Sequence, residues 1–232
     1  MTMLETTALS VLQPVAFDLY RDIHKGIRSE LFAIVGEAGR LDPADATGVA
    51  ALSDCVRRTM HLLVEHAEHE DGAIQPALEL HAPSLAARVA ADHHELESRM
   101  DWLGELAVEL TATASRRAPL HELYIELAAF TGAYLLHQDL EERTIGQVLE
   151  SAIGVDGVID IHVAIIGGMP PQQLVGALAV MFPAMNVDDR TDLLGGMRAS
   201  APAEAFDQVW SLAKSVLSAH DAHAVAARLD LV

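Results

Sequence analysis

Hydrophobic residues recur every three to four positions along most of the chain, which is the pattern of helices that bury one face. No stretch shows the strict alternation of a half-buried strand. The pattern predicts four long helices, over residues 17–38, 47–80, 84–113 and 119–151. Because short links between long helices favour antiparallel neighbours, we predict an all-α fold whose first domain, 1–153, is an up-down-up-down four-helix bundle.

Glycines and the Pro170-Pro171 pair interrupt the pattern after residue 153, so we place a domain boundary there. The remaining residues, 154–232, show three shorter helical patterns, at 172–185, 188–197 and 203–218. We expect them to form a small C-terminal helical subdomain that packs on the bundle or mediates a homodimer.

Two of the long helices carry a histidine and a glutamate four positions apart on their apolar face. Positions four apart in an α-helix differ by about 40°, so His66 and Glu70 point the same way, as do His137 and Glu141. Glu142 lies about 140° from His137, and only a local widening of the helix would turn it inward. The sequence therefore predicts two inward His-x-x-x-Glu pairs.

The other two helices each add a histidine to the buried side. His24 shares the face of Phe17, Tyr20 and Leu31, and His93 shares that of Val89 and Leu96. A carboxylate buried without a partner is costly, and buried charges are normally paired or bound to metal. Four imidazoles and two carboxylates on facing helices predict a site for two cations, which suits iron or manganese, with zinc as a further alternative.

Charge and composition limit the partners that we expect. The net charge is −19, and such an acidic surface repels the phosphates of nucleic acids and of anionic membranes. We therefore predict neither a nucleic-acid partner nor a membrane partner. Cys55 is the only cysteine, so no internal disulfide is possible, and a cytoplasmic location is expected.

The order and spacing of these residues resemble the hemerythrin-like, HHE cation-binding family. The resemblance covers about residues 17–150 and rests on the segments "DIHKGIR", "EHAEHEDGAIQP", "ADHHELE" and "LLHQDLEERTI". It implies a centre of two iron ions with an oxo or hydroxo bridge, and chemistry with O2 or related small redox molecules. Carried over onto this sequence, it implies as metal ligands His24, His66, Glu70, His93, His137 and Glu141.

One position departs from the animal oxygen carriers of that family, which have a second histidine one turn after the ligand on the third helix. Here Glu97 stands at that position and is a further candidate ligand; otherwise one iron keeps an open or water-filled position. Harder oxygen ligands favour ferric iron, so simple O2 transport is disfavoured. Tyr20, Tyr134 and His69 are candidates to support the ligands by hydrogen bonds.

Three functions fit this pattern. The first is a non-haem di-iron protein that binds or senses O2 or a related redox species. The second is a di-iron enzyme that acts on peroxide, NO or an organic substrate with O2. The third is an iron-responsive binding protein, in which metal loading alters a partner surface. The sequence leaves open whether the protein is an enzyme.

Overall fold

The computed structural model describes residues 12–231, and within this range it contains helices and turns but no strand. The all-α prediction is confirmed for these residues. Residues 1–11 of the predicted first domain and Val232 lie outside the described range. The long elements of the first part, joined by the short helix α3 (Gln75–His81), are α1 (Arg21–Arg40), α2 (Ala46–Ala73), α4 (Pro83–Ala112) and α5 (Arg117–Leu140).

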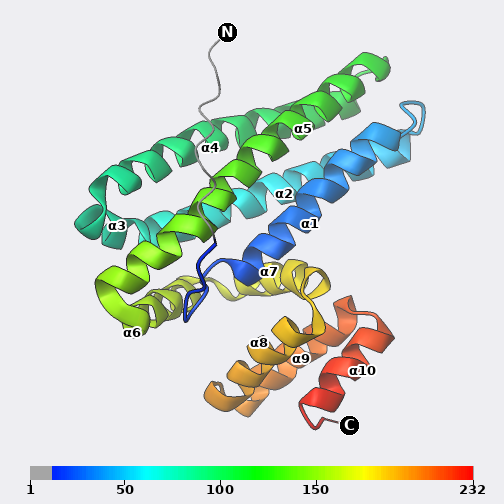
Figure 1. Cartoon of the computed structure of the whole chain (residues 1–232). Helices are drawn as coiled ribbons and strands as arrows, with labels where there is room; N and C mark the ends of the chain where they lie inside the picture. The colour runs from blue at the N-terminus through cyan, green and yellow to red at the C-terminus, as the bar shows by residue number, and fades with distance from the viewer. Residues whose placement is uncertain (1–11, 232) are drawn as a thin grey trace.

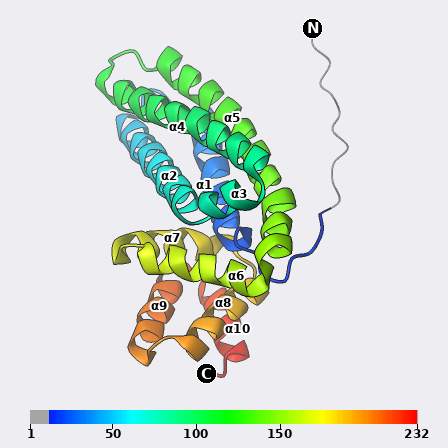
Figure 2. The same cartoon turned by 90° about the vertical axis from the view of Figure 1, so that its left-hand side faces the viewer.

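These four helices lie side by side around a shared apolar core (Figures 1 and 2). Helix α1 packs against α2 and α5, and α4 packs against the same two helices. We call the cluster between them the main core; it includes Leu31, Leu63, Met100 and Leu127, all buried. Burying such a side chain stabilises the fold by about 1.5–3 kcal/mol relative to leaving it exposed.

Local signals in the sequence explain where the second predicted helix begins and ends. The Asp45 carboxylate caps α2 by accepting hydrogen bonds from the backbone N–H groups of Thr47 and Gly48. Proline cannot continue a helix without losing a backbone hydrogen bond. The segment 47–80 is accordingly divided: α2 ends at Ala73, and α3 starts with Pro76 in its first turn.

The fourth predicted helix extends further than expected. After α5 the chain forms a π-helical turn, η1 (Glu141–Ile145), and continues directly into α6 (Gly146–Gly168). The expected break near residue 154 is only a kink, at which Gly154 adopts a φ of 73° that favours glycine. Beyond the kink, Val158 packs with Tyr20, Ile74 and Leu149 in a second apolar cluster, the lower core. The division into two domains at 153/154 stays a prediction.

The last part of the chain forms α7 (Pro171–Ala184), α8 (Val187–Ser200), α9 (Ala203–Val216) and α10 (Ala219–Arg228) around a third apolar cluster. We call α7 to α10 the C-terminal unit. Helix α10 is absent from the sequence prediction because its apolar pattern is only ten residues long. The unit packs on α1 through α7: a Cβ at Gly26 would lie 2.9 Å from Val180 Cγ1, so this approach requires glycine. Lys25 and Arg21 of α1 both form ion pairs with Asp189 of α8.

Within residues 12–231, no single helix has both the length and the apolar character needed to cross a membrane. The helical segment Arg117–Gly168 and the following Pro171–Ala184 pass such a test together by length and composition, but they are bent by 116° relative to each other.

Candidate metal centre

The six residues that the sequence singles out as ligands lie together between the main core and the lower core. On α4, for example, His93 lies between Val89 of the lower core and Leu96 of the main core. They come from five elements and are almost fully buried, with exposed fractions of 0% for His24 and 1% for Glu141. The six residues are His24 on α1, His66 and Glu70 on α2, His93 on α4, His137 on α5 and Glu141 on η1.

The donor atoms form two groups, which we call the His24 half and the His93 half. In the His24 half, the Nε2 atoms of His24 and His66 are 3.3 Å apart. Glu70 Oε1 lies 3.2 Å from His66 Nε2, and Glu141 Oε2 lies 3.5 Å from His24 Nε2. His24, His66 and Glu70 therefore have donor atoms within 4.8 Å of one another, and Glu141 Oε2 lies beside His24.

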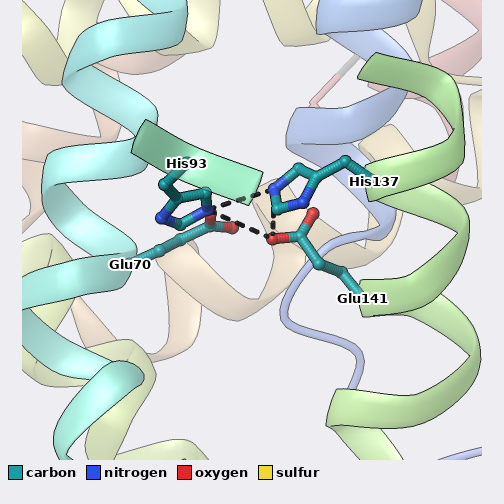
Figure 3. A group of neighbouring side chains, drawn as sticks. All are labelled: Glu70, His93, His137 and Glu141. Carbon is teal, nitrogen blue, oxygen red and sulfur yellow. Dashed lines mark hydrogen bonds and ion pairs between the residues drawn. The ribbon is translucent and has the colours of Figure 1, made fainter. Parts of the chain in front are cut away.

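The His93 half repeats this arrangement (Figure 3). The Nε2 atoms of His93 and His137 are 3.1 Å apart. Glu70 Oε2 lies 3.4 Å from His93 Nε2, and Glu141 Oε1 lies 3.0 Å from His137 Nε2. Four side chains of this half, Glu70, His93, His137 and Glu141, have donor atoms within 4.8 Å of one another, a spacing that could hold a metal ion.

Each glutamate presents one oxygen to each half, so both carboxylates are placed to bridge two cations. Both Glu70 oxygens and Glu141 Oε2 are buried without a hydrogen-bond donor among the described residues. A buried charged oxygen without a donor costs several kcal/mol of the free energy of folding unless another group satisfies it. Metal ions would satisfy these oxygens, and the donor set of imidazoles and carboxylates fits such ions.

Two further carboxylates lie beside the outer ring nitrogen, Nδ1, of two of the four histidines. Glu142 Oε1 lies 2.9 Å from His24 Nδ1, and Asp71 Oδ1 lies 2.8 Å from His93 Nδ1. With Nδ1 donating to a carboxylate, Nε2 presents its lone pair to the interior, which is the arrangement of metal-bound histidines. His137 has no such partner among the described residues, because the nearest carboxylate oxygen, on Asp92, is 3.9 Å from its Nδ1.

The π-helical turn sets the directions in which the side chains of Glu141 and Glu142 point. It widens the helix directly after His137-x-x-x-Glu141, at the position where the sequence leaves the role of Glu142 open. Glu141 points inward, whereas Glu142 reaches across to α1 and pairs with His24 and Arg28. Glu142 is therefore placed as a partner of a candidate ligand and not in either donor group.

The electrostatics of the two halves differ strongly. Burial lowers the pKa of His93, but the adjacent carboxylates of Glu141, Glu70 and Asp71 outweigh it and raise that pKa to about 11. Burial and the neighbouring His24 lower the pKa of His66 to about 3. Burial and the charge of Glu141 raise the pKa of Glu70 to about 7. Without metal, the carboxylates around His93 thus favour a positive charge in the His93 half.

The other candidates take different places. Tyr20 and Tyr134 are buried beside the centre, with ring centroids 5.0 Å from that of His24 and 6.0 Å from that of His137. The Tyr20 hydroxyl has no hydrogen-bond partner among the described residues. His69 and Glu97 are partly exposed and join neither donor group. Glu97 lies one turn beyond His93, about 6 Å along the axis of α4.

A narrow cavity between packed side chains borders the centre on the side of the lower core. It is too narrow to admit a water-sized sphere. Its lining combines apolar side chains, such as Ile74 and Leu78, with Tyr20, Glu70 and His93. The centre is therefore closed by packed side chains in this conformation.

Sequence reasoning missed the roles of Asp71 and Arg28. A signal for Asp71 was present, because each inward glutamate is followed directly by a second acid, as Glu70-Asp71 and Glu141-Glu142. The next residue on a helix is rotated by about 100°, so the second acid can face a neighbouring helix. Which histidine it meets there depends on tertiary packing.

Comparisons with known proteins identify no relative: the sequence matches no family model, and neither a curated protein nor a solved structure shows significant similarity.

Proposed function

We propose that the chain is a hemerythrin-like protein in which α1, α2, α4 and α5 form a four-helix bundle around two iron ions, and that it binds or senses O2 or a related small redox species. One observation carries the proposal: two buried glutamates, with three carboxylate oxygens that lack donors, stand between two pairs of histidines. When bound, the iron ions would supply reversible one-electron chemistry and an affinity for O2.

The donor set supports iron over the alternatives. The imidazole nitrogens and carboxylate oxygens of the two halves suit iron and manganese, and zinc also accepts such ligands. Di-iron sites inside helical bundles are built from facing histidines and glutamates. In this proposal Glu70 and Glu141 would hold the ions through their carboxylate oxygens, and His24, His66, His93 and His137 would hold them through Nε2.

The closed surroundings support a small ligand over a large one. The cavity beside Glu70 and His93 is narrow and mostly apolar in its lining, so an organic substrate would require the helices to move apart. Ile74, Leu78 and Val89 line this side, and small movements of such side chains would be enough to admit an uncharged diatomic molecule. The proposed iron ions would balance the negative charges of Glu70 and Glu141 inside the protein.

Metal content tests the proposal. The full-length chain, loaded with Fe2+ without oxygen and freed of excess metal, should contain about two irons per chain by elemental analysis. His66→Ala should lose at least one of them, because it removes a donor of the His24 half. His69→Ala is a matched control, since His69 is a histidine on the same helix outside both donor groups, and it should keep both irons. Unchanged iron content in His66→Ala would refute the assignment.

Spectroscopy then separates binding from catalysis. A visible absorption band that appears with O2 and disappears when O2 is removed supports binding or sensing. An enzyme acting on peroxide or NO is the second candidate, because the Tyr20 hydroxyl borders the cavity without a hydrogen-bond partner among the described residues and could donate a proton there. Sustained consumption of peroxide that falls in Tyr20→Phe, with iron content unchanged, would favour this second function.

A further inference from the structure

The outer carboxylates are arranged by the same rule in both halves of the centre. Each directly follows one of the two central glutamates, Glu70 or Glu141, and each contacts the histidine of a helix that contributes only one of the six candidate ligands. Asp71 leaves α2 toward His93 on α4, and Glu142 leaves η1 toward His24 on α1, with contacts of 2.8 and 2.9 Å to the respective Nδ1 atoms. In both halves one helix thus supplies a bridging oxygen and also orients a ligand of its neighbour.

The two halves differ in what else the outer carboxylate meets. Arg28 donates two hydrogen bonds to Glu142, from Nη1 to Oε1 at 2.7 Å and from Nη2 to Oε2 at 3.0 Å. This forked geometry is the strongest form of arginine–carboxylate pairing. No lysine or arginine within residues 12–231 pairs with Asp71, whose side chain is 45% exposed to solvent. The Glu142 charge is therefore shared between His24 and Arg28, whereas the Asp71 charge acts on His93 and on water.

Resting on the function proposed above, we infer that Asp71 and Glu142 are positioning residues for two metal ions, and that Arg28 makes the His24 half the weaker site. A carboxylate on the outer nitrogen makes a histidine a more basic ligand, and losing it typically costs 10- to 100-fold in metal affinity. The Arg28 guanidinium partly neutralises the Glu142 carboxylate, so His24 becomes a less basic ligand. It also places a positive charge near the cation. Water partly screens the charge of Asp71, but it does not place a positive charge beside that carboxylate as Arg28 does beside Glu142.

Unequal halves imply ordered loading. The His93 half fills first, and the His24 half fills at a higher metal concentration.

A metal titration of the full-length chain tests this inference. Co2+ is the probe, because its visible absorption reports the ligands and needs neither O2 nor activity. The metal-free protein should bind Co2+ in two resolved steps. His93→Ala should abolish the tighter step and His24→Ala the weaker one, which assigns each step to a half.

Three variants then test the positioning residues. Asp71→Asn should weaken the tighter step by about 10- to 100-fold, because the amide oxygen still accepts from Nδ1 but its charge is lost. Glu142→Gln should weaken the other step by less than about 10-fold. Arg28→Gln should strengthen that step and narrow the gap between the two. Helix content measured by circular dichroism confirms that each variant is folded.

Asp139→Asn is the matched control. It removes a carboxylate of similar exposure, 44%, that lies two residues after His137 but pairs with Arg143. Both steps should keep the affinities of the unmodified protein. An equal loss in Asp139→Asn and Asp71→Asn would reduce the effect to general charge and overturn the inference. If Asp71→Asn leaves both Co2+ binding steps unchanged, this inference is also overturned, but the proposed metal centre is not. Failure of the unmodified chain to bind Co2+ would overturn the proposed function itself.

Discussion

Buried charges occur in two regions of this protein, the candidate metal centre and the C-terminal unit, and the two regions satisfy them differently. In the C-terminal unit, Arg190 is only 4% exposed, yet each of its nitrogens has a partner. Nε donates to the carbonyl of Phe182 at 2.7 Å, Nη2 to that of Pro183 at 3.2 Å, and Nη1 lies 3.5 Å from Asp221 Oδ2. In the centre, by contrast, Glu70 is buried with neither oxygen accepting a hydrogen bond from the described residues.

The contrast separates two uses of a buried charge. Arg190 satisfies the carbonyls at the end of α7 and ties them to α10, so the protein itself completes its coordination. Glu70 and Glu141 have oxygens that the surrounding side chains do not complete. A satisfied buried charge indicates a role in the fold, whereas buried oxygens that lack donors and face one another indicate a missing ligand.

The largest expected effect is the gain in stability on metal binding. A ligand that binds only the folded state at 1,000 times its dissociation constant stabilises that state by about 4 kcal/mol. We expect the free energy of unfolding to rise by about this amount with Fe2+ in the absence of oxygen, and the gain to disappear in Glu141→Leu. Urea unfolding followed by circular dichroism measures both. Glu122→Leu, at an exposed glutamate of α5, should keep the full gain; a gain that survives in Glu141→Leu would mean that the metal binds elsewhere.

A smaller effect is expected from Arg190→Met, which should destabilise the protein by about 3 kcal/mol whether or not metal is present, because it leaves buried carbonyls without donors. Trp210 lies in the C-terminal unit, so its fluorescence during urea unfolding reports this region once Trp102 is replaced by Phe. Arg198→Met is the control, since Arg198 is an exposed arginine of the same helix that donates to the Leu229 carbonyl. If the loss of stability in Arg190→Met depended on metal, the distinction between a buried charge that serves the fold and buried charges that bind metal would be wrong.

The smallest effect concerns pH. The pKa of His66 is lowered to about 3 by burial and by His24, so folding favours its neutral form. Its contribution is fully present above the ordinary pKa of 6.5, and it is lost as the pH falls from 6.5 toward 3. The metal-free chain should lose at most about 1.4 kcal/mol of stability per pH unit from this group. Urea unfolding at pH 7, 6 and 5 should show a shallower slope in His66→Gln, and an identical slope would contradict the assignment.

Much of the candidate site could be chosen from the sequence because helical phase is a local property. The spacings His66-x-x-x-Glu70 and His137-x-x-x-Glu141 place both members on one face wherever the helix lies. The all-α class follows in the same way from periodicity. Glu97 shows the limit of this reasoning: it shares the phase of His93 but lies a turn away from the point at which the helices converge.

The sequence alone therefore determined the helical class, the apolar faces and the residues that these faces carry, because each depends on the rotation between neighbouring residues of one helix. Tertiary structure decided which oxygen of each glutamate faces which half, that Asp71 meets His93, and that Arg28 meets Glu142. It also decided that α6 continues past Gly154 and that α7 covers Gly26. These features depend on how helices far apart in the chain approach one another, and periodicity within one helix carries no information about that approach.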